Sequence, residues 1–450
     1  MAESVHVNFP SQVVSDLEKM SYDYGLRIAR AIEQEWFNGS HSNKYYDAQA
    51  KFHKLRLYAR GEQSIQKYKD ELSINGDLSY LNLDWKPIPI IPKFVDIMVN
   101  GMSDRMFNVK AYSQDQYGVS KRTDYMEAML RDMQTKVFND QAAAGMSMNL
   151  YETDPEVLPE TEEELALHMQ LTYKQNVEIA EEQAINSLLD GNSYDLTRRR
   201  LLYDLTVLGI GCVKTNFNFS EGVTVEYVDP ANLIYSYTDS PYFDDIYYVG
   251  EVKTIPIPEL VRQFPHLAQS DLEDINKSAK RPSGRYTFRE TADKNKVQIL
   301  YFNYKTYTHD TYKVKETGTG SEKAIEKEDT FNPPEQNEGN YYKLQRAVEC
   351  VYEGALILGT DKLLAWNKCE NMIRDKSDFN KVKMNYSIVA PRMYNGQIES
   401  TVSRITGFAD MIQLTHLKLQ QVMSKMVPDG VYLDADGLAE IDLGNGTNYN

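Results

Sequence analysis

The residues of this chain that could bind a transition metal or act as a nucleophile are seven histidines and three cysteines. None of them forms an HExxH or a Cys-x-x-Cys motif, and no histidine lies at metal-ligand spacing from a cysteine. The cysteines are typical of reduced, small apolar residues in a cytosolic protein. The sequence therefore predicts no metal site, no cofactor and no disulfide framework. The positions concerned are His6, His41, His53, His168, His266, His309, His416, Cys212, Cys350 and Cys369.

Other motifs of enzyme active sites are missing from the sequence as well. It contains neither GxSxG nor GxxxxGK[ST], and its Gly209-Ile210-Gly211 lacks the third glycine of a dinucleotide fingerprint and precedes a predicted strand. The acidic run 160–164 is consecutive, so its carboxylates point in different directions; it is typical of a solvated helix start, where acids favour the helix dipole. A metal-dependent nuclease would need a convergent carboxylate cluster, which the spacing does not show. We expect no catalytic residues and no enzyme activity.

The best candidate for nucleic-acid binding by charge is the stretch 44–69, with seven Lys/Arg against two acids. Tyr45, Tyr46 and Tyr58 are interleaved with these cations. The alternative is a surface helix whose lysines extend over apolar neighbours, and this structural interpretation is favoured. His416, on an apolar stripe, is more typical of an interior histidine than of a ligand or a pH switch.

The composition of the 450 residues is that of a globular protein, with 42% hydrophobic and 26% charged residues. The net charge of −17 argues against a protein that grips nucleic acid or an anionic membrane with its whole surface. The 32 tyrosines, against 15 phenylalanines and 3 tryptophans, suit large, partly wet interfaces. We expect a soluble chain, because the N-terminus lacks the features of a signal peptide and no run is long enough to span a membrane.

Hydrophobic periodicity predicts an α+β architecture, helix-rich to about residue 210, strand-rich to about 395, and then a long helix. Six helical stretches are expected in the first part: one capped by Ser11 and ending at Gly39, then 44–69, 93–106, one from residue 125, one after residue 164, and one that ends at Gly209. The apolar side of 93–106 comprises Phe94, Ile97, Met98, Gly101 and Met102. A Pro-rich connector, 85–92, precedes it.

Strands are expected at 212–219, 222–227, 244–252, 297–314 and 341–358, with a charged loop at 317–339. A helical patch follows Pro258 and is interrupted at Pro265. The final helix, 399–426, is about 40 Å long at 1.5 Å per residue. Its predicted apolar stripe runs through Val402, Ile405, Phe408, Ile412, His416, Leu419, Met423 and Met426.

The order of these segments resembles the portal proteins of tailed bacteriophages, and most closely those of crAss-like phages. The segments that carry the resemblance are a helix end at 58–63, the connector and helix at 85–102, a helix–glycine–strand unit at 204–213, the turn at 225–233, the segments 244–249 and 258–260, and the long helix at 400–426. The resemblance covers nearly the whole chain. It implies a portal-type fold with a helix-rich wing, long stem helices and a β-containing clip, assembled as a ring.

The resemblance also implies a division of the chain. Residues 1–255 are expected to form the wing, with a helical elaboration at 117–190, and residues 256–283 the first stem helix. Residues 284–397 would form the clip, 398–427 the second stem helix, and 428–450 the start of a return to the wing. Because portal proteins continue into more wing and a crown, we expect the gene product to extend beyond residue 450.

As a portal, the chain is expected to form a homo-oligomer, a dodecamer, at one capsid vertex in the virion, after assembly in the cytoplasm of the host bacterium. The implied partners are the major capsid protein, the terminase large subunit during packaging, the tail adaptor or connector ring and double-stranded genomic DNA in transit, with no membrane. His416, Lys418 and Lys425 are candidates to face the DNA channel. The alternative function is a head-to-tail adaptor or connector ring protein. Candidate subunit-interface residues are Ile405, Ile412, Leu419, Tyr301, Tyr304 and Tyr307.

Overall fold

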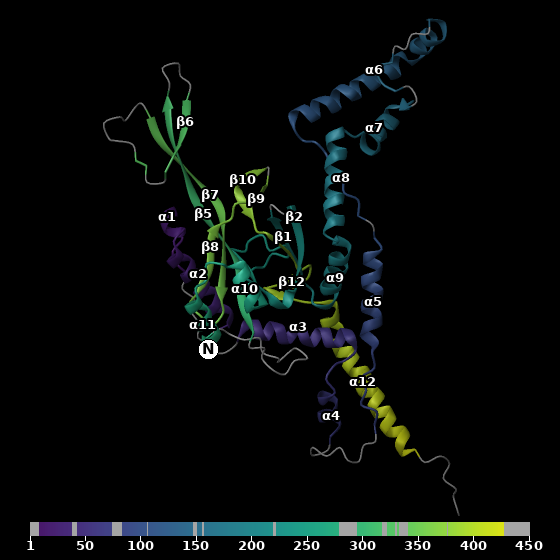
Figure 1. The fold of residues 1–450 in the computed structure, drawn as a ribbon. Coiled ribbons are helices and arrows are strands. Elements are labelled where there is room, and N and C mark those ends of the chain that lie inside the picture. The colour runs from purple at the N-terminus through teal and green to yellow at the C-terminus, as the bar shows by residue number, and fades with distance from the viewer. Residues whose placement is uncertain are drawn as a thin grey trace, which may run out of the picture.

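A six-stranded antiparallel sheet lies at the centre of the fold, in strand order β3-β4-β5-β7-β8, with β6 paired to the far half of β5 (Figure 1). We describe it from a computed structural model. The structure describes residues 9–37, 43–73, 83–105, 107–146, 151–154, 157–218, 222–278, 295–316, 322–328, 331–332, 341–375 and 377–426. The strands of this sheet are β3 (Leu233–Tyr235), β4 (Tyr248–Pro256), β5 (Lys296–Glu316), β6 (Glu322–Lys327), β7 (Tyr341–Ile357) and β8 (Leu363–Lys368).

Strands β5 and β7 are long enough to belong to two different regions. Near Ile299 and Ile357 they lie between β4 and β8, whereas near Lys315 and Tyr341 they form a ribbon that projects from the sheet with β6 alongside (Figure 1). The loop expected at 317–339 therefore contains a strand. This strand is β6, and all six of its residues are exposed, so backbone pairing with β5 holds it in place. Its sequence lacks the apolar alternation that marks a strand.

A smaller three-stranded sheet, in order β11-β1-β2, packs beside the first. Val389 of β11 pairs with Gly211 of β1, so the chain returns to this sheet 178 residues later in sequence (389 − 211). The expected strand pair near residues 212–227 is confirmed. The strands are β1 (Gly211–Asn218), β2 (Gly222–Val228) and β11 (Tyr386–Val389), and two short pairs complete the β structure: β9 (Ile373–Asp375) with β10 (Asp378–Lys383), and β12 (Met393–Tyr394) with β13 (Gln397–Ile398).

The N-terminal helices cover the six-stranded sheet. The single helix expected from Ser11 is two helices, α1 (Asp16–Lys19) and α2 (Tyr22–Phe37), and Ser15 is the N-cap of the first. Lys19 is fully buried and donates a hydrogen bond to the backbone oxygen of Tyr307 on β5, which holds α1 to the ribbon. The buried face of α2 includes Tyr24, Ile28 and Ile32.

The core beside the smaller sheet is built by α3 (Lys44–Arg60), α5 (Ile90–Ser103) and α9 (Tyr194–Val207), with α4 (Gln66–Leu72) nearby. Arg56 of α3 makes a bidentate contact with Asp229, with one N–O distance of 2.7 Å, and lies 3.5 Å from Asp204 of α9. Burial raises the pKa of Asp204, and the hydrogen bond from Tyr227 and the charge of Arg56 oppose that rise. These pairs favour the structural interpretation of the basic stretch 44–69.

The segment expected as the first stem helix differs from that expectation in the part described. It holds two short helices, α10 (Ile257–Gln263) and α11 (Gln269–Ser278), and residues 279–283 lie outside the described residues. Pro265 cannot continue a helix, and Leu260 and Ile275 of the two helices pack on one face of the six-stranded sheet. That sheet joins β3 and β4, expected in the wing, to β5, β7 and β8, expected in the clip.

The segment expected as a helical elaboration is helical, with α6 (Gln116–Met146), α7 (Glu162–Leu171) and α8 (Asn176–Gly191), and it extends away from the sheets (Figure 1). Met129, Leu158 and Leu165 form its small core. Thr161 caps α7 and Glu162–Glu164 fill its exposed first turn, which confirms the solvated helix start predicted for the acidic run.

Candidate interaction surface

The long C-terminal helix α12 (Thr401–Lys425) begins at a capping box, in which the side chains of Ser400 and Ser403 each accept a hydrogen bond from the other's backbone N–H. Its length, about 38 Å at 1.5 Å per residue, carries its second half away from the body (Figure 1). One face packs against α3, α5 and α9. The buried residues of that face are Val402, Ala409, Asp410, Gln413 and Leu417.

A buried carboxylate fixes the middle of α12 to the body. Asp410 accepts hydrogen bonds from the hydroxyls of Tyr58 (2.8 Å) and Tyr68 (2.7 Å) and pairs with the Lys67 ammonium at 2.6 Å. Burial alone would raise the pKa of Asp410, but the hydrogen bonds from Lys67, Tyr68 and Tyr58 outweigh it and hold that pKa below its ordinary value. The aspartate is therefore ionised at neutral pH and links α12 to α3 and α4.

A second face of α12 is apolar and exposed over most of its length. Its members form two groups at three- and four-residue spacing, 408–412 and 419–426, which lie on the same side of the helix with the exposed Thr415 between them, and together they make one stripe. Among the described residues no element covers them. Contiguous exposed apolar patches of this kind mark interaction sites in proteins. The exposed fractions are 66% for Phe408, 59% for Met411, 45% for Ile412, 55% for Leu419, 58% for Val422, 63% for Met423 and 69% for Met426.

The predicted stripe of α12 mixes these two faces. Val402 is fully buried, and Ile405 is half-buried and packs against the chain's own core. Ile412 and Leu419 do lie on the exposed stripe. Met411 and Val422 belong to it too, although the prediction omitted them; their three-residue spacing from Phe408 and Leu419 was the available signal.

The candidate channel residues lie on different sides of α12. His416 is half-buried, with its Nε2 atom 2.7 Å from Nε2 of Gln420, so it lies toward the packed side, as the interpretation of an interior histidine expects. Lys418 is exposed at the edge of the apolar stripe, seven residues or two helical turns after Met411, and away from the core contacts. Lys425 follows Lys418 by seven residues, two helical turns, and so occupies the same side of the helix at its far end.

Helix α5, which contacts α12, also presents apolar residues to solvent. The side identified from the sequence as apolar is exposed: Phe94 is 53%, Ile97 59% and Met98 38% exposed. The residues that pack inward are Ile91 and Val95, together with Val99. An α-helix with apolar residues on both sides gives no signal of which side faces the core.

The tyrosines proposed for subunit contacts are largely used inside the chain. Tyr304 is fully buried, and its hydroxyl accepts a hydrogen bond from Gln12, so it offers no surface to another subunit. Tyr301 packs in the core between the sheet and α10 and donates its hydroxyl to Gln263 at 2.7 Å. Tyr307 is half-buried beneath the Lys19 ammonium, 4.0 Å from the ring centroid.

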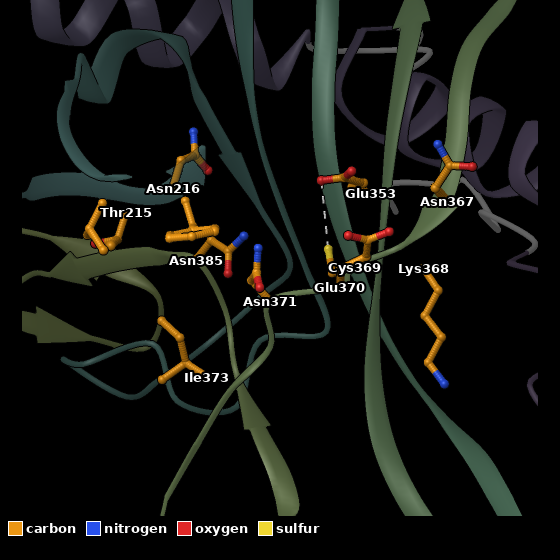
Figure 2. Close-up of a pocket in the computed structure, with 12 residues that line it drawn as sticks. Thr215, Asn216, Glu353, Asn367, Lys368, Cys369, Glu370, Asn371, Ile373 and Asn385 are labelled. Carbon is orange, nitrogen blue, oxygen red and sulfur yellow. Dashed lines mark hydrogen bonds between the residues drawn. The ribbon is translucent and has the colours of Figure 1, made fainter. Parts of the chain in front are cut away.

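A polar cavity of about 700 Å³ lies between the two sheets (Figure 2). It is lined by Asn216 and Asn385 on one side and by Glu353 and Cys369 on the other. Burial, and then the neighbouring Glu353 carboxylate, raise the pKa of the Cys369 thiol to about 12, so the thiol is protonated at neutral pH and poorly nucleophilic. All three cysteines are buried and free, as the sequence predicts. The cavity therefore supplies polar groups without an activated nucleophile.

The described residues contain no group of three or more His, Cys, Asp or Glu placed to hold a metal ion. Within the same residues, no helix is both long and apolar enough to cross a membrane. No protein-family model matches the chain, and no curated protein sequence is significantly similar to it. The exposed apolar stripe of α12 is thus the feature of the described surface that points most directly to an interaction.

Proposed function

We propose that this protein is a phage portal protein, a ring-forming conduit for double-stranded DNA with no catalysis of its own. The observation that carries the proposal is α12, a helix of 25 residues that projects from the body with an uncovered apolar stripe. The chain's own core leaves that stripe exposed, so a neighbouring subunit that covers it removes its apolar surface from water. A stripe that packs against a different surface of the next subunit makes a head-to-tail contact, and such contacts form a ring when the rotation between neighbouring subunits closes on itself.

The acidity of the chain supports the same function. Each phosphate that a protein neutralises releases counterions and adds affinity, so a conduit that neutralised many phosphates would hold its DNA. A chain of net charge −17 repels phosphates instead, and symmetry multiplies that charge around a ring. The exposed Lys418 of α12 would give only a sparse contact to passing DNA. In this proposal the ring also docks the packaging terminase and later the tail.

The mass of the purified protein in solution tests the proposal. Twelve chains of 51.8 kDa give a particle of about 620 kDa, and light scattering at micromolar concentration should report a mass of several hundred kilodaltons. A monomer that stays near 52 kDa over the micromolar range would count against a ring and hence against this function.

A further inference from the structure

The polar cavity between the two sheets (Figure 2) adjoins a second hollow, of about 340 Å³. Both are lined by Asn216, Phe217, Glu353 and Asn385, so we treat them as one inter-sheet cleft. These side chains come from β1, from β7 and from the residue before β11, so parts of the chain that are far apart in sequence meet there. The two volumes lie in the range of about 300–1,000 Å³ that is typical of sites for small molecules.

Asparagine side chains that the fold does not use line much of the inter-sheet cleft. One of them, Asn303 of β5, is only 6% exposed, and its Nδ2 atom has no hydrogen-bond partner among the described residues. A buried donor without an acceptor is rare in native proteins and indicates a bound water or ligand nearby. The side-chain amides of four more form no hydrogen bond within the same part of the chain: Asn216, Asn367, Asn371 and Asn385. Each such amide offers two N–H donors and an acceptor oxygen to a ligand.

The charges around the inter-sheet cleft nearly balance. Lys214 and Glu226 pair with oppositely charged neighbours on β4, at 3.2 and 3.6 Å. The other charged side chains of the lining, with a formal charge of −1 (1 − 2), are Lys368, Glu353 and Glu370. The Lys368 side chain points away from Asn216 and Asn385 (Figure 2). A phosphate or another anion would therefore meet two carboxylates with little opposing charge, so the lining disfavours an anionic ligand.

The rest of the lining suits hydroxyl groups and C–H faces. Among the described residues the Glu353 carboxylate accepts only from the Cys369 thiol, at 3.8 Å, so its oxygens can accept from ligand hydroxyls. Phe217 is 47% exposed and follows Asn216 on β1, so the two side chains leave the strand in opposite directions and flank its edge. A sugar ring carries hydroxyls, which both donate and accept, around C–H faces that pack on apolar side chains. Amides, a carboxylate and an exposed aromatic ring match both parts of such a ligand.

We propose that the inter-sheet cleft binds a neutral saccharide through hydrogen bonds with Asn216, Asn385 and Glu353, with Phe217 at its apolar side. The site does not depend on the ring, so this inference goes beyond the proposed function. A nucleotide is a poorer occupant, because Lys214 is paired and Lys368 points away, which leaves its phosphate without a cation. An inorganic cation would pair with the carboxylates but would leave the amide N–H donors and the Phe217 ring unused.

Saturation-transfer NMR of the purified full chain tests the site, with D-glucose, D-galactose and N-acetyl-D-glucosamine as separate probes. We expect the wild type to bind at least one of them. Asn216→Ala/Asn385→Ala should weaken that binding about ten-fold, because hydrogen bonds to an uncharged ligand are lost. Asn100→Ala/Asn176→Ala, at exposed asparagines of α5 and α8 outside the cleft, should leave it unchanged. Circular dichroism of each variant separates loss of binding from loss of fold.

Two further comparisons describe the ligand more closely. Glu353→Gln keeps an acceptor oxygen, so the binding of a neutral sugar should fall by no more than about three-fold, whereas that of a cation would be lost. Maltotriose that binds about ten-fold more tightly than glucose would indicate a glycan chain as the ligand, and equal affinities would indicate a free sugar.

A wild-type protein that binds none of the three sugars would overturn the proposal. Sugar binding that survives Asn216→Ala/Asn385→Ala would overturn it too, because the ligand would then lie elsewhere. Adenosine monophosphate that binds in the cleft while the sugars do not would assign the site to a nucleotide. The mass of the particle in solution is measured separately, so the saccharide site and the proposed portal function can fail independently.

Discussion

Replacing Ile412 with aspartate should abolish ring assembly while the single chain stays folded. The Ile412 side chain is 45% exposed in the isolated chain and lies in the middle of the α12 stripe, so Ile412→Asp should change the free energy of unfolding by no more than about 0.5 kcal/mol. In a ring the same site is covered, and burying an unpaired carboxylate there should cost about 2–3 kcal/mol or more at every interface. Size-exclusion chromatography with light scattering should show a folded monomer.

A matched control places the same charge on the same helix. Gln421 is nine residues from Ile412, about 180° around the helix, and lies away from the apolar stripe. Gln421→Asp should therefore assemble like the wild type. Intact rings from Ile412→Asp would mean that the stripe does not face a neighbouring subunit, and equal loss of assembly in both variants would indicate a general effect of charge on α12.

Removing the carboxylate of Asp410 should detach α12 from the body. Tyr58 is 5% exposed and Tyr68 is fully buried, and Asp410→Ala leaves the hydroxyls of both without their hydrogen-bond acceptor. The same change leaves Lys67 without its partner. The loss of these charge-assisted hydrogen bonds should destabilise the fold by about 3 kcal/mol. Urea unfolding measures that loss, and hydrogen exchange should show faster exchange in α12 than in the six-stranded sheet.

Asp410→Asn separates the hydrogen bonds from the charge. Its amide oxygen can still accept from the tyrosines but its NH₂ group cannot pair with Lys67, so the loss of stability should be smaller than for alanine. Because the folded-state pKa of Asp410 lies below its ordinary value, its stabilisation is present above the unfolded pKa of about 3.9 and is lost as pH falls through the folded pKa. The stability difference between wild type and Asp410→Asn should therefore shrink below about pH 4. A constant difference down to pH 2 would contradict this role.

Periodicity and capping predicted the existence of most long elements. The apolar pattern predicted α12 to within two residues of each end. Gly209 has a φ of 82°, the left-handed conformation expected of a glycine that follows the end of a helix, here α9. Strand β6 was missed, because its exposed Lys/Glu sequence carries no apolar signal.

The exposed surface could be predicted only in part, because burial depends on what packs against each face. On α12 the packed side includes the polar Asp410 and Gln413, while Phe408 and Ile412 are exposed, the reverse of what hydrophobicity alone predicts. The same reversal occurs on α5. The 32 tyrosines suggested interfaces, yet five of them are fully buried within the chain: Tyr24, Tyr68, Tyr248, Tyr304 and Tyr352. The hydroxyls of the first four reach partners, such as Glu35 from Tyr248, whereas the Tyr352 hydroxyl has no hydrogen-bond partner among the described residues.

Electron microscopy of the purified protein can show the ring itself. We expect a closed ring with a central channel wide enough for a DNA duplex, with α12 at the contacts between subunits and the β5–β7 ribbon and the α6–α8 helices at different levels of the particle. The order of wing, stem and clip along the axis would also distinguish a portal from an adaptor ring. Images of single chains, of symmetric dimers or of rings in which α12 contacts no neighbour would contradict the proposed portal function.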